Sequence, residues 1–281
     1  MKNFLLICVI IVLLPKALVL NAQDMTNKGN LFVYWGYNRS CYTKSDIHFN
    51  GQEYDVTFYG VVAKDRPSPL SINYLNITQL SVPQYNFRMG YYLNDRWSLS
   101  FGNDHMKYVV QQRQHTEMSG YIQSSSEPKY NGSYLHKDVI LDEDLLIFDH
   151  TNGLNVLSLD VNYYQPLLQK RKLKIEATIG LGGCFVVTKS NVKMLNIGQD
   201  NRFHLSGYTA LGNFGLRTYY GKHFFFTAET KGGYVTLPDV LVNGKEPMRA
   251  SHNFGYLEYY VAVGYRYALL NKIRKIKQRT K

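Results

Sequence analysis

The chain has 281 residues and a formal net charge of +11, and it is rich in tyrosine (24), glycine (22) and phenylalanine (14). Of its three cysteines, Cys8 lies in the apolar N-terminal stretch, and the two distant ones that remain, Cys41 and Cys184, do not predict a disulfide framework. After residue 22 no segment offers about 20 consecutive apolar residues, so we expect no transmembrane helix there. A tyrosine- and glycine-rich chain with few helix signals is typical of either a soluble β-sandwich or a membrane β-barrel.

The first 22 residues, MKNFLLICVIIVLLPKALVLNA, predict a secretory signal peptide. Lys2 is basic, the stretch from Phe4 to Leu14 is apolar, and the small Ala22 precedes the predicted cleavage point. A transmembrane anchor is the alternative, but Pro15 and Lys16 interrupt the apolar stretch. We therefore expect an exported chain that begins near residue 23.

Eight segments alternate apolar and polar side chains with the period of a β-strand. They cover residues 30–42, 84–93, 97–111, 153–168, 172–189, 203–220, 223–236 and 252–269. Strands of about ten residues with one apolar face and aromatic ends suit a tilted bilayer crossing. Every backbone donor in lipid needs a partner, so such a sheet has to close.

The connections between these segments alternate in length. Short ones lie at 94–96, 169–171 and 221–223, and long ones at 43–83, 112–151, 190–202 and 237–251. Short periplasmic turns and long external loops are typical of a membrane barrel, although a soluble sandwich would also alternate along its strands. The segment 53–63, EYDVTFYGVVA, alternates too. It is either a hairpin outside the membrane or a pair of further strands that raises the count to ten.

We predict an all-β protein, a transmembrane antiparallel up-and-down β-barrel of about eight strands. The signal peptide occupies 1–22, the barrel 23–270, and a basic periplasmic tail 271–281. Six positive charges lie in the last ten residues, KIRKIKQRTK, where we expect them to meet anionic lipid or other envelope polymers rather than nucleic acid. The predicted location is the outer membrane of a Gram-negative bacterium.

Charged residues recur on the predicted lumen face, with opposite signs on neighbouring strands. They are Arg88, Asp160, Lys174, Glu176, Arg217, Glu229, Lys231, Glu258 and Arg266. An eight-stranded barrel is only wide enough for its own side chains, and buried charges are tolerated when they are paired. We expect a salt-bridged plug, with a narrow conducting pore as the alternative.

The mature chain resembles small eight-stranded outer-membrane barrels. Two stretches, WGYNRSCYTKSDIHFNGQEYDVTFYGVVAKDRP and VPQYNFRMGYYLNDRWSLSFGNDHMKY, also resemble a family of uncharacterised envelope barrels. The resemblance implies a fold and a location, and it implies no particular chemistry.

A possible catalytic pair occurs in FHLSG, where His204 and Ser206 are two residues apart. Alternation places both on the face of Tyr208, toward lipid, where a histidine could deprotonate a serine for acyl transfer. The pair resembles that of the outer-membrane lipid A 3-O-deacylases, eight-stranded barrels with a lipid-facing site. That family has Asn after the serine, whereas Gly207 follows here, and the nearest orienting carboxylate, Glu229, is predicted in the lumen. A lipid-modifying esterase is therefore an alternative function.

Other candidate chemistry is weak. Seven of the eight histidines map to loops or external strand ends, but no fixed ligand spacing recurs, so we expect no metal and no cofactor. In SFGNDHMKYVVQQ, Gly102 marks either a β-bulge that swaps the faces of Asp104 and His105, or a strand that has left the membrane. We expect a structural or binding role through loops 43–83 and 112–151. The expected partners are outer-membrane lipid, lipopolysaccharide, and a surface protein or ligand.

Overall fold

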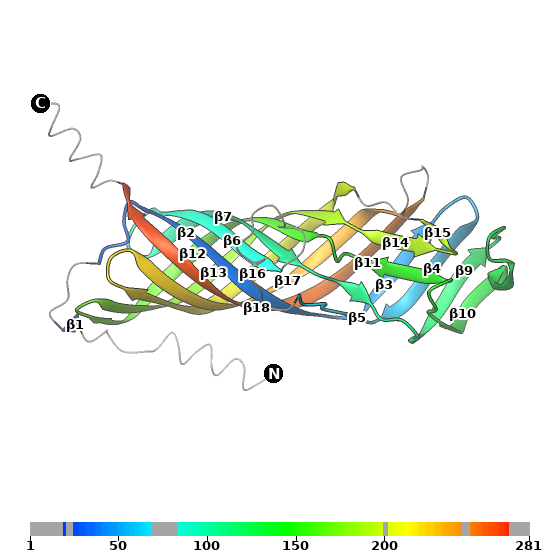
Figure 1. Ribbon diagram of the computed structural model, residues 1–281, viewed down its shortest axis with the longest axis horizontal. Coiled ribbons are helices and arrows are strands. Elements are labelled where there is room, and N and C mark those ends of the chain that lie inside the picture. The colour runs from blue at the N-terminus through cyan, green and yellow to red at the C-terminus, as the bar shows by residue number, and fades with distance from the viewer. Residues whose placement is uncertain (1–18, 21–24, 69–83, 199–201, 243–247, 270–281) are drawn as a thin grey trace, which may run out of the picture.

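The computed structural model describes residues 19–20, 25–68, 84–198, 202–242 and 248–269 (Figure 1). The elements within these ranges include β-strands and a short 3-10 helix, Pro128–Tyr130. Apart from the two-residue β1 (Val19–Leu20), every strand pairing is antiparallel. The rest of the predicted signal peptide and the predicted tail at 271–281 lie outside the described residues. Within the described ranges no helix is long and apolar enough to cross a membrane.

Eight long strands form a continuous series of antiparallel pairs. They are β2 (Asn30–Tyr42), β6 (Tyr85–Tyr92), β7 (Trp97–Met106), β12 (Leu154–Lys170), β13 (Leu173–Lys189), β16 (Phe203–Tyr220), β17 (Phe224–Leu241) and β18 (Arg249–Ala268). β18 pairs with β17 and also with β2, so the series returns to its first strand. In Figure 1 these strands wind obliquely around the long axis of the molecule.

Tight turns join these strands at one end of the molecule, on the left of Figure 1. The turn between β12 and β13 places Arg171 at φ 41°, and the turn between β16 and β17 places Gly221 at φ 69°. The left-handed backbone at Gly221 explains the glycine, because a residue without Cβ adopts this conformation at little cost. The predicted short connections therefore lie together.

The long connections fold into a second body at the other end, which we call the head. It comprises residues 45–64, 109–149 and 191–198 and the adjoining ends of β17 and β18, residues 236–242 and 249–254. Four of its strands continue the main sheet: β3 (Ser45–Asn50), β4 (Tyr54–Val61), β9 (His115–Ile122) and β10 (Gly132–Ile140). A smaller sheet contains β5 (Ala63–Lys64), β8 (Val109–Val110), β11 (Leu146–Asp149), β14 (Asn191–Met194) and β15 (Ile197–Gly198). The segment 53–63 belongs to this head as β4 and does not enter the series of eight.

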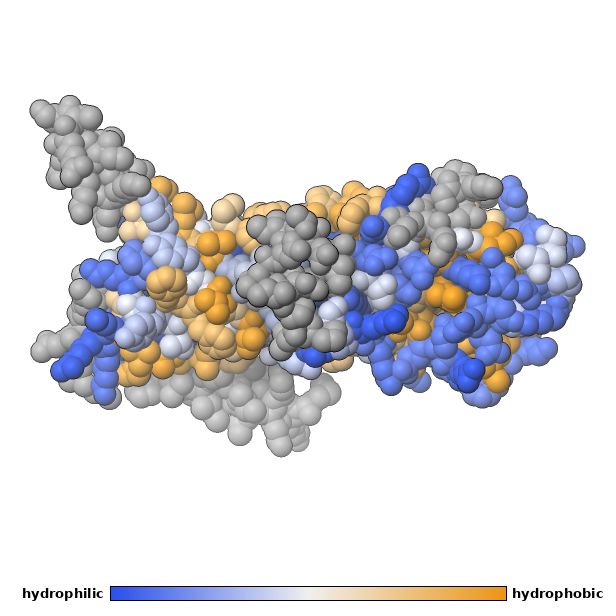
Figure 2. Space-filling model, in the orientation of Figure 1, coloured by the Kyte–Doolittle hydropathy of each residue, from blue (hydrophilic) through white to orange (hydrophobic). Residues whose placement is uncertain are grey.

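The surfaces of the two bodies differ. On the eight-strand body the outward side chains are large and apolar, and Leu181 and Val263 are 74% and 64% exposed. On the face seen in Figure 2, hydrophobic residues gather over this body and hydrophilic residues over the head. Exposed aromatic side chains mark both edges of the apolar band. They are Trp97, Tyr220, Phe224 and Tyr265 toward the tight turns, and Phe203, Tyr208 and Tyr234 toward the head.

The interiors also differ: that of the head is apolar, and that of the eight-strand body is largely polar. The head encloses an apolar core that includes Phe49, Phe58, Phe148 and Val192. The interior of the eight-strand body is lined by buried charged, hydroxyl and aromatic side chains. One alternating pattern thus serves two environments: the apolar faces of the strands point outward on the eight-strand body and inward in the head.

Candidate functional site

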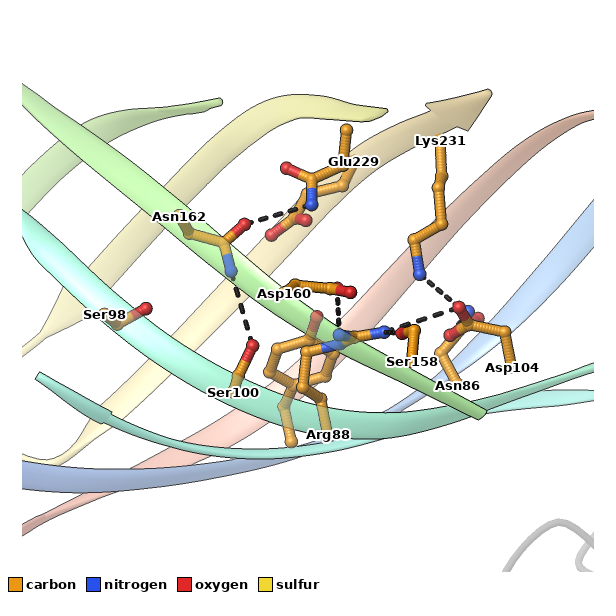
Figure 3. Close-up of polar contacts among 12 residues, drawn as sticks. Asn86, Arg88, Ser98, Ser100, Asp104, Ser158, Asp160, Asn162, Glu229 and Lys231 are labelled. Carbon is orange, nitrogen blue, oxygen red and sulfur yellow. Dashed lines mark hydrogen bonds and ion pairs between the residues drawn. The ribbon is translucent and has the colours of Figure 1, made fainter. Parts of the chain in front are cut away.

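The structure places all nine predicted lumen charges in the interior of the eight-strand body, each at most 6% exposed. They form three layers along the long axis. The layer nearest the head is shown in Figure 3. There the Arg88 guanidinium contacts the carboxylates of Asp160 and Asp104, the second at 3.4 Å, and the Lys231 ammonium contacts Asp104 as well. Asp104 therefore links two cations from different strands.

Asn86 completes this layer. Its amide nitrogen donates to Asp104 Oδ1 at 2.8 Å and to Glu258 Oε1 at 2.9 Å. Lys231 Nζ lies 3.9 Å from Glu258 Oε2. The two carboxylates are thus held apart by a shared amide and a shared ammonium, which limits their mutual repulsion.

Asp104 was not among the predicted lumen residues. Regular alternation places it there, after the inward-facing Ser98, Ser100 and Gly102. The β7 register with both neighbours runs unbroken through Gly102, so the bulge proposed there is wrong. Glycine is required for another reason, because a Cβ at Gly102 would lie 2.8 Å from the guanidinium carbon of Arg88. Counting inward positions past Gly102 would have found Asp104.

The middle layer surrounds Arg217 with aromatic rings. Its guanidinium carbon lies 4.5 to 5.4 Å from four ring centres, those of Phe32, Tyr34, Tyr164 and Phe225. Its charge is balanced by Glu229, whose Oε1 lies 3.5 Å from Nη2. Thr227 and Tyr260 each donate to that carboxylate at 2.7 Å. This buried cation is therefore held by rings and a paired carboxylate together.

The third layer lies toward the tight turns and includes a residue that was not predicted, Asn27. Lys174 Nζ lies 2.7 Å from Glu176 Oε1. The Asn27 amide donates to the same oxygen at 3.0 Å, and Arg266 donates to the Asn27 carbonyl at 2.6 Å. Charges and their hydrogen-bond partners thus fill this level of the interior too.

On the head, a pocket of about 400 Å³ opens on the outer face where β3, β4, β17 and β18 meet. His48 lies opposite both Thr57 and Ser251 in the sheet, and Asn253 lies opposite Thr236. The β17–β18 register shifts between Leu237 and Val240, where β17 contains Pro238 and Asp239. Proline cannot donate to a ladder, and such a bulge opens the sheet locally.

A buried pair of histidines lies where the head joins the eight-strand body. The Nε2 atoms of His150 and His252 are 3.4 Å apart, and His150 Nδ1 lies 2.7 Å from the Ser190 hydroxyl. Burial lowers the pKa of His150 from 6.5 to about 3. Burial, and secondarily the neighbouring His150, lowers the pKa of His252 well below its usual value. Both imidazoles are therefore neutral in the folded protein at pH 7.

The predicted catalytic pair is not exposed to lipid. A register shift at Val186 and Val187 inserts Ser206 as an extra residue in β16, so the strand changes face between His204 and Tyr208. Ser206 is 1% exposed, and its hydroxyl lies 2.6 Å from that of Thr188. The expectation that the pair faces lipid is wrong.

His204 has a different carboxylate partner from the one considered in the sequence. Its Nε2 lies 2.8 Å from Asp239 Oδ2, and Asp239 also pairs with Arg249 at 2.9 Å. Glu229 lies in the middle layer of the interior, beside Arg217. Among the described residues, no group of three or more His, Cys, Asp or Glu side chains is arranged to hold a metal ion.

No family model and no curated protein matches the chain. Similar solved structures include the N-terminal β-barrel domain of Pseudomonas aeruginosa OprF, at 13% identity over 85% of this chain and 98% of that one (TM-score 0.29). Ail of Yersinia pestis is 9% identical over 85% and 99% (TM-score 0.31). Neisserial surface protein A is 10% identical over 86% and 97% (TM-score 0.32). Likenesses this distant do not establish a function for this chain.

Proposed function

We propose that this protein is a closed, eight-stranded barrel of a Gram-negative outer membrane whose plugged lumen supports an external binding head. The observation that carries the proposal is the apolar band around the eight-strand body, which lies opposite a charged interior. Monomeric soluble proteins rarely expose apolar patches larger than a few hundred Å². A bilayer gives such a band a matching environment, and the return of the strand series to β2 leaves no unpaired edge in lipid.

The paired charges favour a plug over a pore. Each of the three layers carries cations, carboxylates and their hydrogen-bond partners in mutual contact, as Figure 3 illustrates for the layer nearest the head. Removing one partner from such a network leaves an uncompensated buried charge, which costs several kcal/mol. The network therefore holds the strands together and fills the space that ions would need.

The head supports a binding role. The predicted binding loops 43–83 and 112–151 form ordered strands over much of their described length, around an apolar core of their own. A preformed surface loses little conformational entropy on binding, which favours recognition. The proposed partners are outer-membrane lipid and lipopolysaccharide around the band, and a surface protein or ligand at the head.

Two measurements on the protein from outer-membrane fractions test this proposal. We expect faster electrophoretic migration before boiling than after, because closed barrels resist detergent unfolding, and we expect no steady conductance in planar bilayers. Recovery of the protein in soluble form without detergent would overturn the membrane assignment. A steady conductance that changes when Arg217 or Glu229 is neutralised would overturn the plug and favour a narrow pore.

A further inference from the structure

The outer pocket of the head presents hydrogen-bonding groups that are not used within the protein. Four half-buried or exposed polar residues line it: Thr57, Thr236, Ser251 and Asn253. Their side chains make no hydrogen bond within the described part of the chain. Hydroxyl and amide groups both donate and accept hydrogen bonds. These side chains can therefore bind water or a ligand that carries both donors and acceptors.

The strands that line the pocket are fixed by the apolar core on their other face. The residues that alternate with its lining on β3 and β4, including Ile47, Phe49, Val56 and Phe58, are fully buried in the core of the head. Strands locked by such packing fix the positions of the side chains on their other face. The lining is therefore preformed, and about 400 Å³ lies within the range of pockets for small ligands.

The chemistry of the lining selects a class of ligand. No Lys or Arg is among the lining residues that the structure describes, which disfavours phosphate and sulfate. Leu237 and Pro238 are its apolar residues, and most of the lining surface is apolar. An acyl chain, however, would leave the hydroxyl, amide and carboxylate groups of the lining without partners. Hydroxyl, amide, imidazole and carboxylate groups around an apolar surface suit a polyhydroxylated molecule, whose hydroxyls form hydrogen bonds and whose C–H faces pack on apolar atoms.

The position of the pocket agrees with this class. Thr236 is two residues beyond Tyr234 on β17, and Tyr234 is an exposed aromatic at the head side of the apolar band. Two strand residues span about 7 Å, so the pocket lies just above the proposed lipid boundary. Sugars of membrane glycolipids lie at this level, and free saccharides also reach it from outside.

We propose that the pocket formed by β3, β4, β17 and β18 binds a neutral saccharide unit. This inference rests on the proposed external orientation of the head. The two sources, a membrane glycolipid and a free oligosaccharide, share the chemistry that the pocket recognises. His48 is held by Asp55 at 2.9 Å and Asp46 accepts the Gly60 amide at 2.8 Å, so both side chains are oriented before a ligand arrives.

Saturation-transfer NMR on the full protein in detergent micelles tests the proposal, with two probes: the oligosaccharide released from lipopolysaccharide by deacylation, and maltotriose. The Thr57→Val/Thr236→Val variant removes two hydroxyls with little change of shape. It should weaken saccharide binding by at least about tenfold. Thr230→Val, on the outward face of the same β17, should bind as the wild type does.

Binding of only the released oligosaccharide would identify a glycolipid, and binding of maltotriose would identify a free saccharide. The proposal is overturned if neither probe binds at about 10 mM, or if the double variant binds as tightly as the wild type. The gel shift on boiling is measured for the same samples. A wild type that shifts but binds no sugar refutes this inference alone, and a wild type without a shift refutes the proposed barrel.

Discussion

Acidification should open the head, because the two buried histidines at its base stay neutral in the folded state at a pH where the unfolded state binds protons. His150 and His252 contact one another, and the rings of Tyr108, Phe148 and Phe254 surround them. No carboxylate contacts either ring in the described residues, and the Tyr108 hydroxyl is bonded to Ser45 instead. A proton added to either imidazole would therefore have no counterion.

The size of the effect follows from the pKa of His150, which burial lowers from 6.5 to about 3. Above pH 6.5 neither state binds a proton and stability is unaffected. Below it the unfolded state binds a proton that the folded state does not, so stability falls by about 1.4 kcal/mol per pH unit until the folded pKa is reached. At about pH 4.5 His150 alone costs about 3 kcal/mol, and the lowered pKa of His252 acts in the same direction.

Hydrogen–deuterium exchange of head peptides, corrected for the intrinsic pH dependence of exchange, measures this opening. Over the range in which both imidazoles stay neutral, the opening equilibrium constant should rise by up to about 100-fold per pH unit below about pH 6. The His150→Phe/His252→Phe variant keeps an aromatic pair and should lose this dependence. His115→Phe is the control, since His115 is exposed and pairs with Asp138 at the surface.

Two results would refute the reasoning. One is protection of β3, β4 and β9 that is the same at about pH 7.5 and about pH 4.5 after correction. The other is a double phenylalanine variant with the same pH dependence as the wild type, because the acid sensitivity would then belong to other groups.

Three further substitutions test the barrel and the site. If the apolar band faces lipid, Leu181→Arg should lower the free energy of unfolding by about 2–4 kcal/mol and reduce the yield of heat-modifiable protein. An unchanged yield would indicate that the band faces water. Arg217→Met leaves Glu229 without its cation and should lower urea stability by about 3–5 kcal/mol; wild-type stability would mean that this pair is not buried. Ser206→Ala removes the hydrogen bond to Thr188 and should lower the free energy of unfolding by about 1 kcal/mol. Lipid A from cells with this variant should have the same mass as lipid A from wild-type cells, and a different mass would restore the esterase hypothesis.

The strands were predictable because side chains alternate between two faces at every residue, whatever the fold around them. All eight predicted segments overlap strands of the series, and β16 begins and ends as predicted, at Phe203 and Tyr220. The same parity placed Arg217 and Glu229 on the inner face. The partner of each charge was not predictable from this alternation, because a contact such as that between Lys231 and Asp104 joins residues 127 positions apart.

Local irregularities limited the prediction of the site. Because Ser206 is an extra residue in β16, His204 and Tyr208 lie on opposite faces of the strand. Nothing in FHLSG distinguishes this bulge from a regular strand. Conversely, Gly102 suggested a bulge where a regular strand makes room for Arg88. A glycine in a strand indicates that a Cβ would not fit there, but the sequence does not show which neighbouring group occupies the space.

The sequence by itself determined the all-β class, the strand positions, the apolar outer face and the charged inner face, because these depend on the period of two within each segment. Only the tertiary structure decided that the long loops fold into a head with its own core. It also decided which charges meet in each layer, that His150 and His252 are buried together, and that a pocket forms at the β17 bulge. These features depend on contacts between segments far apart in the chain, which alternation within a segment does not encode.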